Sequence, residues 1–142
     1  MLVEKGLEQR FRAFFQFLDD LGYGAATAVE FATIGGVTAI QQRNQVGAYA
    51  FVGGTHKVDR DVPPCAKASG NPVRFGGLNL HALRLHPDLF PENRVEALSR
   101  AYRELYRSGR PVAEVIEELK KGPEPLFQAF FDEHWGGSLI RP

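Results

Sequence analysis

The sequence predicts a β-helix followed by α-helices, with a further helix at the N-terminus. The first observation is that a β-branched aliphatic residue recurs at every sixth position: Ile34, Ile40, Val46, Val52, Val58. A period of six fits neither an amphipathic helix, whose period is 3.6, nor a strand that alternates at two. It is typical of hexapeptide repeats, whose short strands form the flat faces of a parallel prism. The second observation is that apolar residues at helical 3–4 spacing dominate the chain before and after this segment.

Residues 1–24 are predicted to contain an amphipathic helix that ends near Gly22 or Gly24. Its apolar residues follow 3–4 spacing: Leu7, Phe11, Phe14, Phe15, Leu18, Leu21. A membrane-surface helix or a partner-binding helix is one interpretation. The polar face carries acids as well as bases, however, and so lacks the cationic bias of a membrane binder. We therefore expect the helix to cover an open end of the prism.

Residues 25–64 are predicted to form the prism, and the alternation of Thr27, Val29 and Phe31 predicts a strand that leads into it. A small or polar residue follows each aliphatic: Gly35, Gln41, Gly47, Gly53, Asp59. We expect this position to lie in a turn, where glycine tolerates a positive φ. Pro63-Pro64 is expected to stop the prism because proline cannot donate to the ladder. Five hexapeptides make a very short prism, so further burial must come from the helices or from other chains.

Residues 65–142 are predicted to hold a loop and then a helical domain. The loop covers 65–79, where Ser69-Gly70-Asn71-Pro72 is rich in turn formers. Four helical segments should follow: a short one carrying Leu80, Leu83 and Leu85, one from about Glu92 to Arg107, one from Pro111 to Lys121, and one from about Pro123.

Composition excludes several classes of function. Lysine and arginine number 17 and aspartate and glutamate number 17, so the net charge of zero lacks the basic footprint of a nucleic-acid binder. A single cysteine, Cys65, excludes an intrachain disulfide framework and a cysteine-cluster zinc site. No apolar run is long enough for a transmembrane segment, and charged residues stand where a signal peptide needs an apolar core. The expected location is the cytoplasm.

Several motifs resemble the acyl carrier protein-dependent UDP-N-acetylglucosamine O-acyltransferases of lipid A biosynthesis. They are the run from Phe31 to Ile40, Val52-Gly53-Gly54, Asp61-Val62-Pro63-Pro64, Gly70-Asn71-Pro72, Gly77-Leu78-Asn79 and the run from Ala101 to Gly109. The likeness extends over residues 29–142. The motifs that follow the hexapeptides, in this order, separate the family from other hexapeptide acyltransferases. The resemblance implies a left-handed prism and a homotrimer with active sites in the clefts between subunits.

The resemblance also implies a reaction. A 3-hydroxyacyl chain would pass from acyl carrier protein to the 3-hydroxyl of UDP-N-acetylglucosamine, without a metal or another cofactor. A histidine would act as general base, because an alcohol becomes a good nucleophile only when a base within hydrogen-bond reach accepts its proton. Backbone N–H groups of the coils could hold the developing oxyanion.

Four residues match substrate-binding positions of the family. Gln42 and Asn79 match polar contacts, Asn79 to the nucleotide, while Gly54 matches a position whose size limits the acyl length. Arg84 stands near the basic cluster that grips the diphosphate. Each also has an ordinary structural interpretation: Gln42 on the solvent face, Asn79 as a helix cap and Arg84 as a surface charge.

The family's base histidine belongs to a coil upstream of the matched region. In this chain that place is taken by the phenylalanine-rich N-terminal segment, which has no histidine. His56 is the only histidine on the predicted prism and is a weak candidate for a replacement base, since an ordinary surface histidine explains it as well. Three hypotheses remain. The first is an acyltransferase that needs another chain. The second is a non-catalytic module that binds the UDP-sugar or the acyl carrier, or that joins full-length subunits in mixed trimers, and the third is a truncated gene product.

Overall fold

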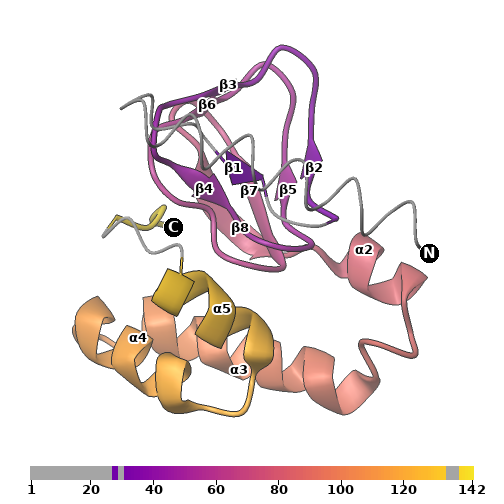
Figure 1. Ribbon diagram of the computed structural model, residues 1–142, viewed down its shortest axis with the longest axis vertical. Coiled ribbons are helices and arrows are strands. Elements are labelled where there is room, and N and C mark those ends of the chain that lie inside the picture. The colour runs from indigo at the N-terminus through magenta and orange to yellow at the C-terminus, as the bar shows by residue number, and fades with distance from the viewer. Residues whose placement is uncertain (1–26, 29–30, 134–137) are drawn as a thin grey trace.

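A computed structural model describes residues 27–28, 31–133 and 138–142 of the chain. The helix predicted over residues 1–24 lies outside the described residues, as does the predicted strand residue Val29. The strands wind into a prism, and helices α3, α4 and α5 form a layer beneath it (Figure 1). The chain is therefore a short parallel β-helix with an α-helical layer, as the sequence predicted.

The prism has three faces, each built from very short strands. Face A pairs β1 (Thr27–Ala28) with β4 (Gln45–Val46), and face C pairs β3 (Ala39–Ile40) with β6 (Lys57–Val58). Face B joins β2 (Thr33–Ile34), β5 (Phe51–Val52) and β7 (Ala66–Ser69) in parallel, and adds β8 (Arg74–Leu78) antiparallel at its end. Each parallel strand lies beside the strand one full coil later, so the period of six is the length of one face.

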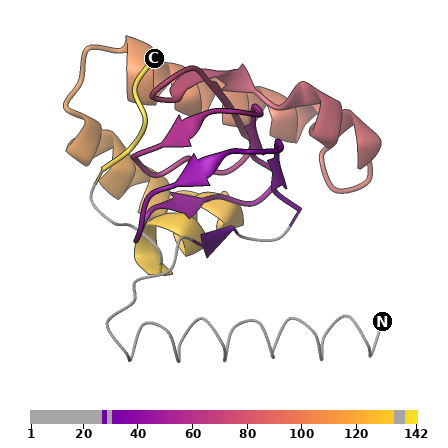
Figure 2. The same ribbon diagram turned by 90° about the horizontal axis from the view of Figure 1, so that it is seen from above.

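The repeating aliphatic residues point into the prism, as expected. Val46, Val52 and Val58 have no exposed surface, and Val62 and Ala68 continue the same buried column. Ile34 and Ile40, one coil earlier, are only partly buried. Among the described residues, the inward side chains are therefore more deeply buried in the later coil than in the earlier one. Figure 2 shows the strands of successive coils stacked one above another.

The corners of the prism differ from the sequence prediction. The left-handed conformation falls three residues after each of the first four aliphatics, on non-glycine residues with φ between 57° and 66°: Val37, Arg43, Tyr49, Thr55. Gly35 and Gly47 have no positive φ and are needed for another reason. A Cβ on Gly35 would lie 2.3 Å from the nitrogen of Gly54, and one on Gly47 would lie 2.5 Å from the nitrogen of Pro64. These glycines allow successive coils to approach closely. The positive φ expected for them is wrong, although Gly47 does begin a turn, in which its carbonyl accepts from the Ala50 amide at 3.2 Å.

The prolines do not stop the prism. Pro63 and Pro64 lie in the bend that leads to Cys65, at a corner where no ladder hydrogen bond is required of them. Strand β7 then pairs in parallel with β5, so face B continues past the predicted boundary at residue 64. The prediction of a loop over 65–79 is wrong for β7 and β8, because a turn-rich sequence at 69–72 marks a hairpin bend between two strands.

The C-terminal end of the prism is closed on all three faces. On face A, Asp61 pairs with Leu139, and the Ile140 amide donates to the Asp61 carbonyl at 3.0 Å. Ile140 is fully buried in the prism core. On face C, the Asn71 side chain accepts from the Lys57 amide at 2.7 Å, which replaces a missing strand. Strand β8 pairs with β7 and closes face B, so backbone groups at this end of each face find partners within the chain.

The helices agree closely with their predicted positions. They are α2 (Leu80–Leu85), α3 (Glu92–Arg107), α4 (Val112–Lys121) and α5 (Pro125–Glu133). A second apolar core fills the space between the prism and the helical layer; its buried members include Leu83, Leu98, Tyr102, Phe127 and Phe131. In the described part of the chain, no helix combines the length and apolar character needed to span a membrane.

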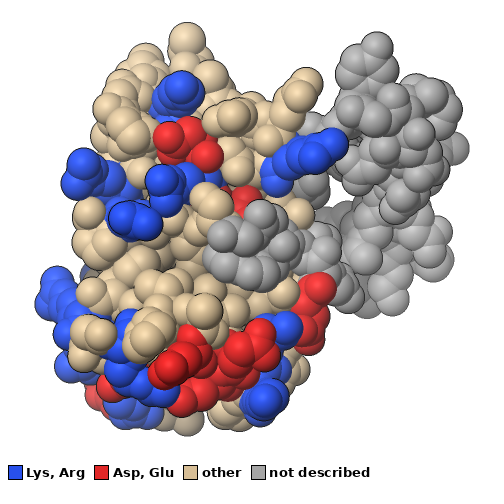
Figure 3. All heavy atoms as spheres, turned by 90° about the vertical axis from the view of Figure 1, so that its left-hand side faces the viewer, with Lys and Arg blue, Asp and Glu red and all other residues tan. Residues whose placement is uncertain are grey.

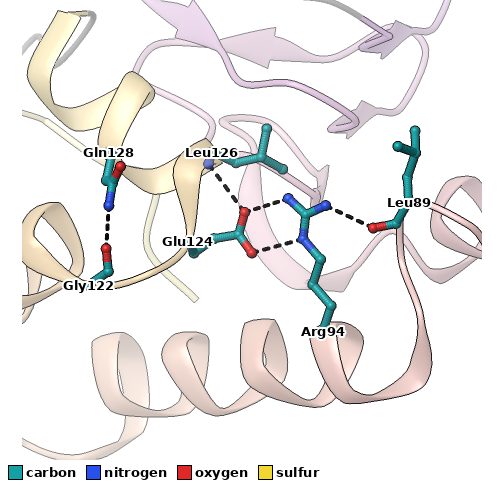
Figure 4. A network of polar contacts seen from close by, with 6 residues as sticks. All are labelled: Leu89, Arg94, Gly122, Glu124, Leu126 and Gln128. Carbon is teal, nitrogen blue, oxygen red and sulfur yellow. Dashed lines mark hydrogen bonds and ion pairs between the residues drawn. The ribbon is translucent and has the colours of Figure 1, made fainter.

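A polar network ties the ends of the helices together (Figure 4). The Arg94 guanidinium donates to both carboxylate oxygens of Glu124, at 3.0 and 2.6 Å, and to the Leu89 carbonyl at 2.8 Å. It also lies 4.6 Å from the centre of the Phe90 ring. Glu124 accepts from the Leu126 amide at the start of α5. A two-pronged pair of this kind fixes orientation as well as distance, and so sets α3 against α5.

Gly35→Ala is expected to lower the free energy of unfolding by about 1–3 kcal/mol or more, because its Cβ must displace the backbone of the next coil. Gly36→Ala is the matched control, since a Cβ there meets nothing within 4 Å. The control should change stability by no more than about 0.5–1 kcal/mol. Urea unfolding followed by circular dichroism measures both, and equal losses would contradict the close-approach explanation.

Candidate functional site

The predicted substrate-binding residues lie at different corners of the prism. Gln42 precedes Arg43 at the corner between faces C and A, where its side chain is exposed. Gly54 precedes Thr55 at the corner between faces B and C. Asn79 lies behind Tyr49, at the corner between faces A and B. Within one chain these three residues therefore do not form a common site.

Asn79 is held by the scaffold through all of its polar groups. Its side-chain amide donates to the Tyr49 carbonyl at 2.9 Å, and its backbone amide donates to the Cys65 carbonyl at 2.8 Å. Its side-chain oxygen accepts from the Ala82 amide at 3.5 Å and caps helix α2. The residue is 8% exposed. The helix-cap interpretation is confirmed, and the same bonds join two successive coils to the first helix.

Gly54 and Arg84 have simpler surroundings. A Cβ on Gly54 would lie 3.2 Å from the Gly36 carbonyl oxygen, so even alanine would need a small backbone adjustment there. The glycine thus serves coil stacking in addition to any space it leaves for a ligand. Arg84 is exposed on α2 and forms no ion pair with the described residues. Its guanidinium is free to meet an anion.

His56 is not arranged as a general base. Its ring lies against Gly53, where an added Cβ would be 2.6 Å from the ring carbon Cδ2. Its buried Nδ1 has no hydrogen-bond partner among the described residues, so nothing there fixes the tautomer or orients the ring. Within the described ranges, His, Cys, Asp and Glu side chains do not come together in any group of three or more that could hold a metal ion.

An aromatic cluster that the sequence analysis did not identify covers the corner between faces A and B. Phe31 stacks on Tyr49 at 5.2 Å between ring centres, and Tyr49 meets the edge of Phe90 at 4.9 Å. His86 lies 5.8 Å from Tyr49. Phe31 and Tyr49 occupy equivalent corner positions one coil apart. This spacing in the sequence could have predicted that their rings meet. Phe31 remains 64% exposed and Leu85 remains 64% exposed, which makes this corner apolar.

Two hollows lie between the prism and the helical layer, away from all four predicted site residues. One, of about 510 Å³, is bordered by α4, the C-terminal residues and Arg60, Arg110 and Arg141. The other, of about 490 Å³, lies between β8 and α3. Figure 3 shows basic side chains on the prism side of one face and a belt of acidic and basic side chains on the helical layer below.

Cys65 is a structural residue with an inert thiol. It has no exposed surface, and burial raises the pKa of its thiol from 9.0 to about 12, with the nearby Glu124 carboxylate adding to the rise. A thiol that stays protonated at neutral pH is a poor nucleophile. The structure thus agrees with the absence of a nucleophilic partner in the sequence.

The family follows from sequence comparison. A profile described as domain 2 of the UDP-N-acetylglucosamine O-acyltransferases matches residues 61–133, just over half of the chain. This chain belongs to the UDP-N-acetylglucosamine O-acyltransferase family. The matched region contains β7, β8 and helices α2 to α5, so the resemblance stated for the motifs from Asp61 onward is confirmed.

Curated members of the acyltransferase family carry the likeness into the prism. The chain is 36% identical over 111 residues to the acyl-[acyl-carrier-protein]–UDP-N-acetylglucosamine O-acyltransferase of Aliivibrio salmonicida, a match that covers 77% of this chain and 42% of the relative. It is 37% identical over 92 residues to the enzyme of the same description from Nautilia profundicola, covering 63% of this chain and 34% of the relative. The chain thus spans less than half the length of these family members.

Solved structures agree on the acyltransferase fold. The UDP-N-acetylglucosamine acyltransferase from Campylobacter jejuni is 26% identical, with a TM-score of 0.69 over 82% of this chain and 46% of its own. The enzyme from Francisella novicida, at 23% identity, shares the fold with a TM-score of 0.74 over 84% of this chain and 45% of its own.

Asn79→Ala should lower the free energy of unfolding by about 1–3 kcal/mol, because it leaves the buried Tyr49 carbonyl without its donor and uncaps α2. Gln42→Ala is the matched control at another predicted site position, and its exposed side chain should cost less than about 0.5 kcal/mol. Chemical denaturation of both variants tests this. An unchanged midpoint for Asn79→Ala would show that these bonds contribute no net stability.

The chain should lose stability at high pH. Burial raises the pKa of Cys65 and also the pKa values of Tyr102 and Tyr106, so the folded state keeps protons that the unfolded chain releases. The stability from each group is fully present well below its unfolded-state pKa, which is 9.0 for Cys65 and 10.0 for each tyrosine. Above that pKa it should fall by about 1.4 kcal/mol per pH unit. The Cys65→Ala variant lacks one of these groups. Between about pH 8 and pH 10.5 it should therefore lose less stability than the unsubstituted chain. Identical losses in the two proteins would contradict the role of the thiol.

Proposed function

We propose that this chain supplies the C-terminal part of a cytoplasmic UDP-N-acetylglucosamine O-acyltransferase of lipid A biosynthesis. Acyl carrier protein would deliver the 3-hydroxyacyl group, and the sugar 3-hydroxyl would receive it. The observation that carries the proposal is family membership, together with the placement of Gln42, Gly54 and Asn79 at three separate corners of the prism.

The corner placement supports a site made by several copies. In a closed ring of three subunits the interface is head-to-tail, so one surface of each copy meets a different surface of the next. A corner that carries Gln42 can then face a corner that carries Gly54 of a neighbouring copy. Residues that are separated within one prism thus line one cleft, which is why we propose a homotrimer. The left-handed winding of the prism is proposed from the family resemblance.

The chain's own residues would bind and orient the substrate. The exposed Gln42 amide can donate to or accept from a sugar or nucleotide oxygen, and the unpaired Arg84 guanidinium suits a diphosphate oxygen. Asn79 would act through the backbone it fixes, since its polar groups already bond to Tyr49, Cys65 and Ala82. Gly54 would leave room for the acyl chain beside the coil.

The general base has to come from upstream coils. His56 lacks an orienting partner among the described residues, and the first coil of the prism offers a surface on which another coil can stack. Its inward residues Ile34 and Ile40 are only partly buried, whereas Val52 and Val58 one coil later are fully buried. The proposal is therefore that these strands continue a longer prism, whose added coils supply the histidine.

A non-catalytic role is the second candidate. The same open coil surface would let the chain join longer subunits in mixed trimers, where it would keep part of the substrate surface without a base of its own. The two candidates differ in turnover once the upstream coils are present.

Sedimentation equilibrium of the full chain should give the mass of a trimer, because the proposed clefts exist only between copies.

The chain alone should show no acyl transfer from hydroxyacyl carrier protein to UDP-N-acetylglucosamine. A fusion of the upstream coils of the Aliivibrio salmonicida relative to residues 29–142 should restore turnover. Arg84→Gln in this fusion should raise the KM for the UDP-sugar about tenfold, since it removes one charge-assisted contact.

Lys67→Gln is the control for that variant, because Lys67 is exposed on face B and belongs to none of the proposed contacts. Turnover by the chain alone would overturn the need for an upstream base. A fusion that assembles as a trimer yet remains inactive would favour the non-catalytic module.

A further inference from the structure

The hollow between β8 and α3 has the composition of a ligand site. Its volume of about 490 Å³ lies within the range of small-molecule sites. The wall on one side is the backbone of Gly76 and Gly77, and the wall on the other side is a stripe of α3 residues at i, i+4 and i+8: Ser99, Arg103, Arg107. A strand and a helix form the two walls, and both are rigid elements. The hollow is therefore preformed.

The two arginines of this stripe have no acidic ion-pair partner among the described residues. Arg103 and Arg107 lie one helical turn apart, both are exposed, and neither forms an ion pair with the described residues. Like charges at this spacing destabilise a helix slightly. Among the described residues that line the hollow there is no Asp or Glu side chain to offset them. Arg74, at the start of β8, places a third guanidinium beside Pro142 at the rim.

The floor of the hollow is aromatic. The Phe75 ring lies 4.6 Å from Tyr106 and 4.9 Å from Tyr102, each measured between ring centres. Tyr106 donates its hydroxyl to the Ile140 carbonyl at 2.8 Å, which locks the ring in place. Phe75 and Tyr106 are only partly buried and so present ring surface to the hollow. Flat rings stack favourably on such a floor.

We propose that this hollow binds a phosphate monoester whose molecule also contains a planar aromatic ring. The ring would lie on Phe75 and Tyr106, and the phosphate would accept hydrogen bonds from Arg103 and Arg107, whose guanidinium forks match phosphate oxygens. Gly77 has φ 112° and open space where a Cβ would be, so the ligand can approach the backbone closely. An aryl phosphate and a mononucleotide share this chemistry, and the test separates them.

The inference is independent of the proposed acyl transfer. None of Gln42, Gly54, Asn79 or Arg84 borders this hollow, and its lining belongs to one chain. Failure of phosphate binding here would leave the acyltransferase proposal untouched, and an inactive fusion would leave this site untouched.

Titration of the full chain with 1-naphthyl phosphate, followed by probe fluorescence, tests the site directly. Saturable binding is expected, and both Arg103→Gln and Arg107→Gln should raise Kd about tenfold, because each removes a charge-assisted contact. Added salt should weaken binding, since both cations are exposed. Competition with uridine monophosphate and with inorganic phosphate then separates a nucleotide from an aryl phosphate.

Two controls make the result decisive. Arg100→Gln changes an arginine of the same helix that does not line this hollow, and Arg84→Gln changes the proposed diphosphate contact; neither should alter Kd by more than about twofold. Arg103→Gln should also leave the helix as stable or slightly more stable, which excludes unfolding as the cause. Binding that is absent, or equally weakened by Arg100→Gln, would overturn the proposal.

Discussion

Close stacking of successive coils is the constraint on which the rest of this structure depends. Each strand of the prism is very short, so the ladder holds only if the next coil comes within hydrogen-bond distance on every face. Gly35 permits this beside Gly54, and Gly47 permits it beside Pro64. The corners meet the same demand differently, since ordinary residues such as Val37 and Tyr49 adopt a left-handed conformation there. The cost of about 1–2 kcal/mol for each such residue must be offset by buried valines and by the ladder.

The two ends of the prism solve the problem of unpaired edges unequally. At the C-terminal end, strand β8, the Asn71 side chain and the returning C-terminal residues each complete one face. Helices α3 to α5 then bury the adjoining surface, and the pair of Arg94 and Glu124 fixes the orientation of α3 relative to α5. At the N-terminal end, the described strands offer an unfinished coil with Ile34 and Ile40 partly uncovered. This asymmetry links the architecture to the proposal that longer prisms, or other chains, complete the active protein.

The same geometry explains why a family site cannot be read from one copy. A triangular prism holds its corners apart, so in the proposed trimer the residues that bind one substrate would come from neighbouring copies. The hollow between β8 and α3 is different, because a strand and a helix of the same chain enclose it. The two proposals are therefore compatible: one subunit would carry one site of its own and parts of the shared sites.

The sequence alone determined the architecture and most helix boundaries. The period of six residues predicts the faces because each face has the length of one hexapeptide, and 3–4 spacing predicts α3 and α4 because apolar residues must share one side of a helix. Only the tertiary structure decided what lies next to what. The need for Gly35, the strand after Pro63-Pro64 and the pairing of Leu139 with Asp61 all depend on backbone contacts between residues far apart in sequence. The separation of Gln42, Gly54 and Asn79 likewise appeared only once the coils were closed, because corner positions are set by winding and not by local pattern.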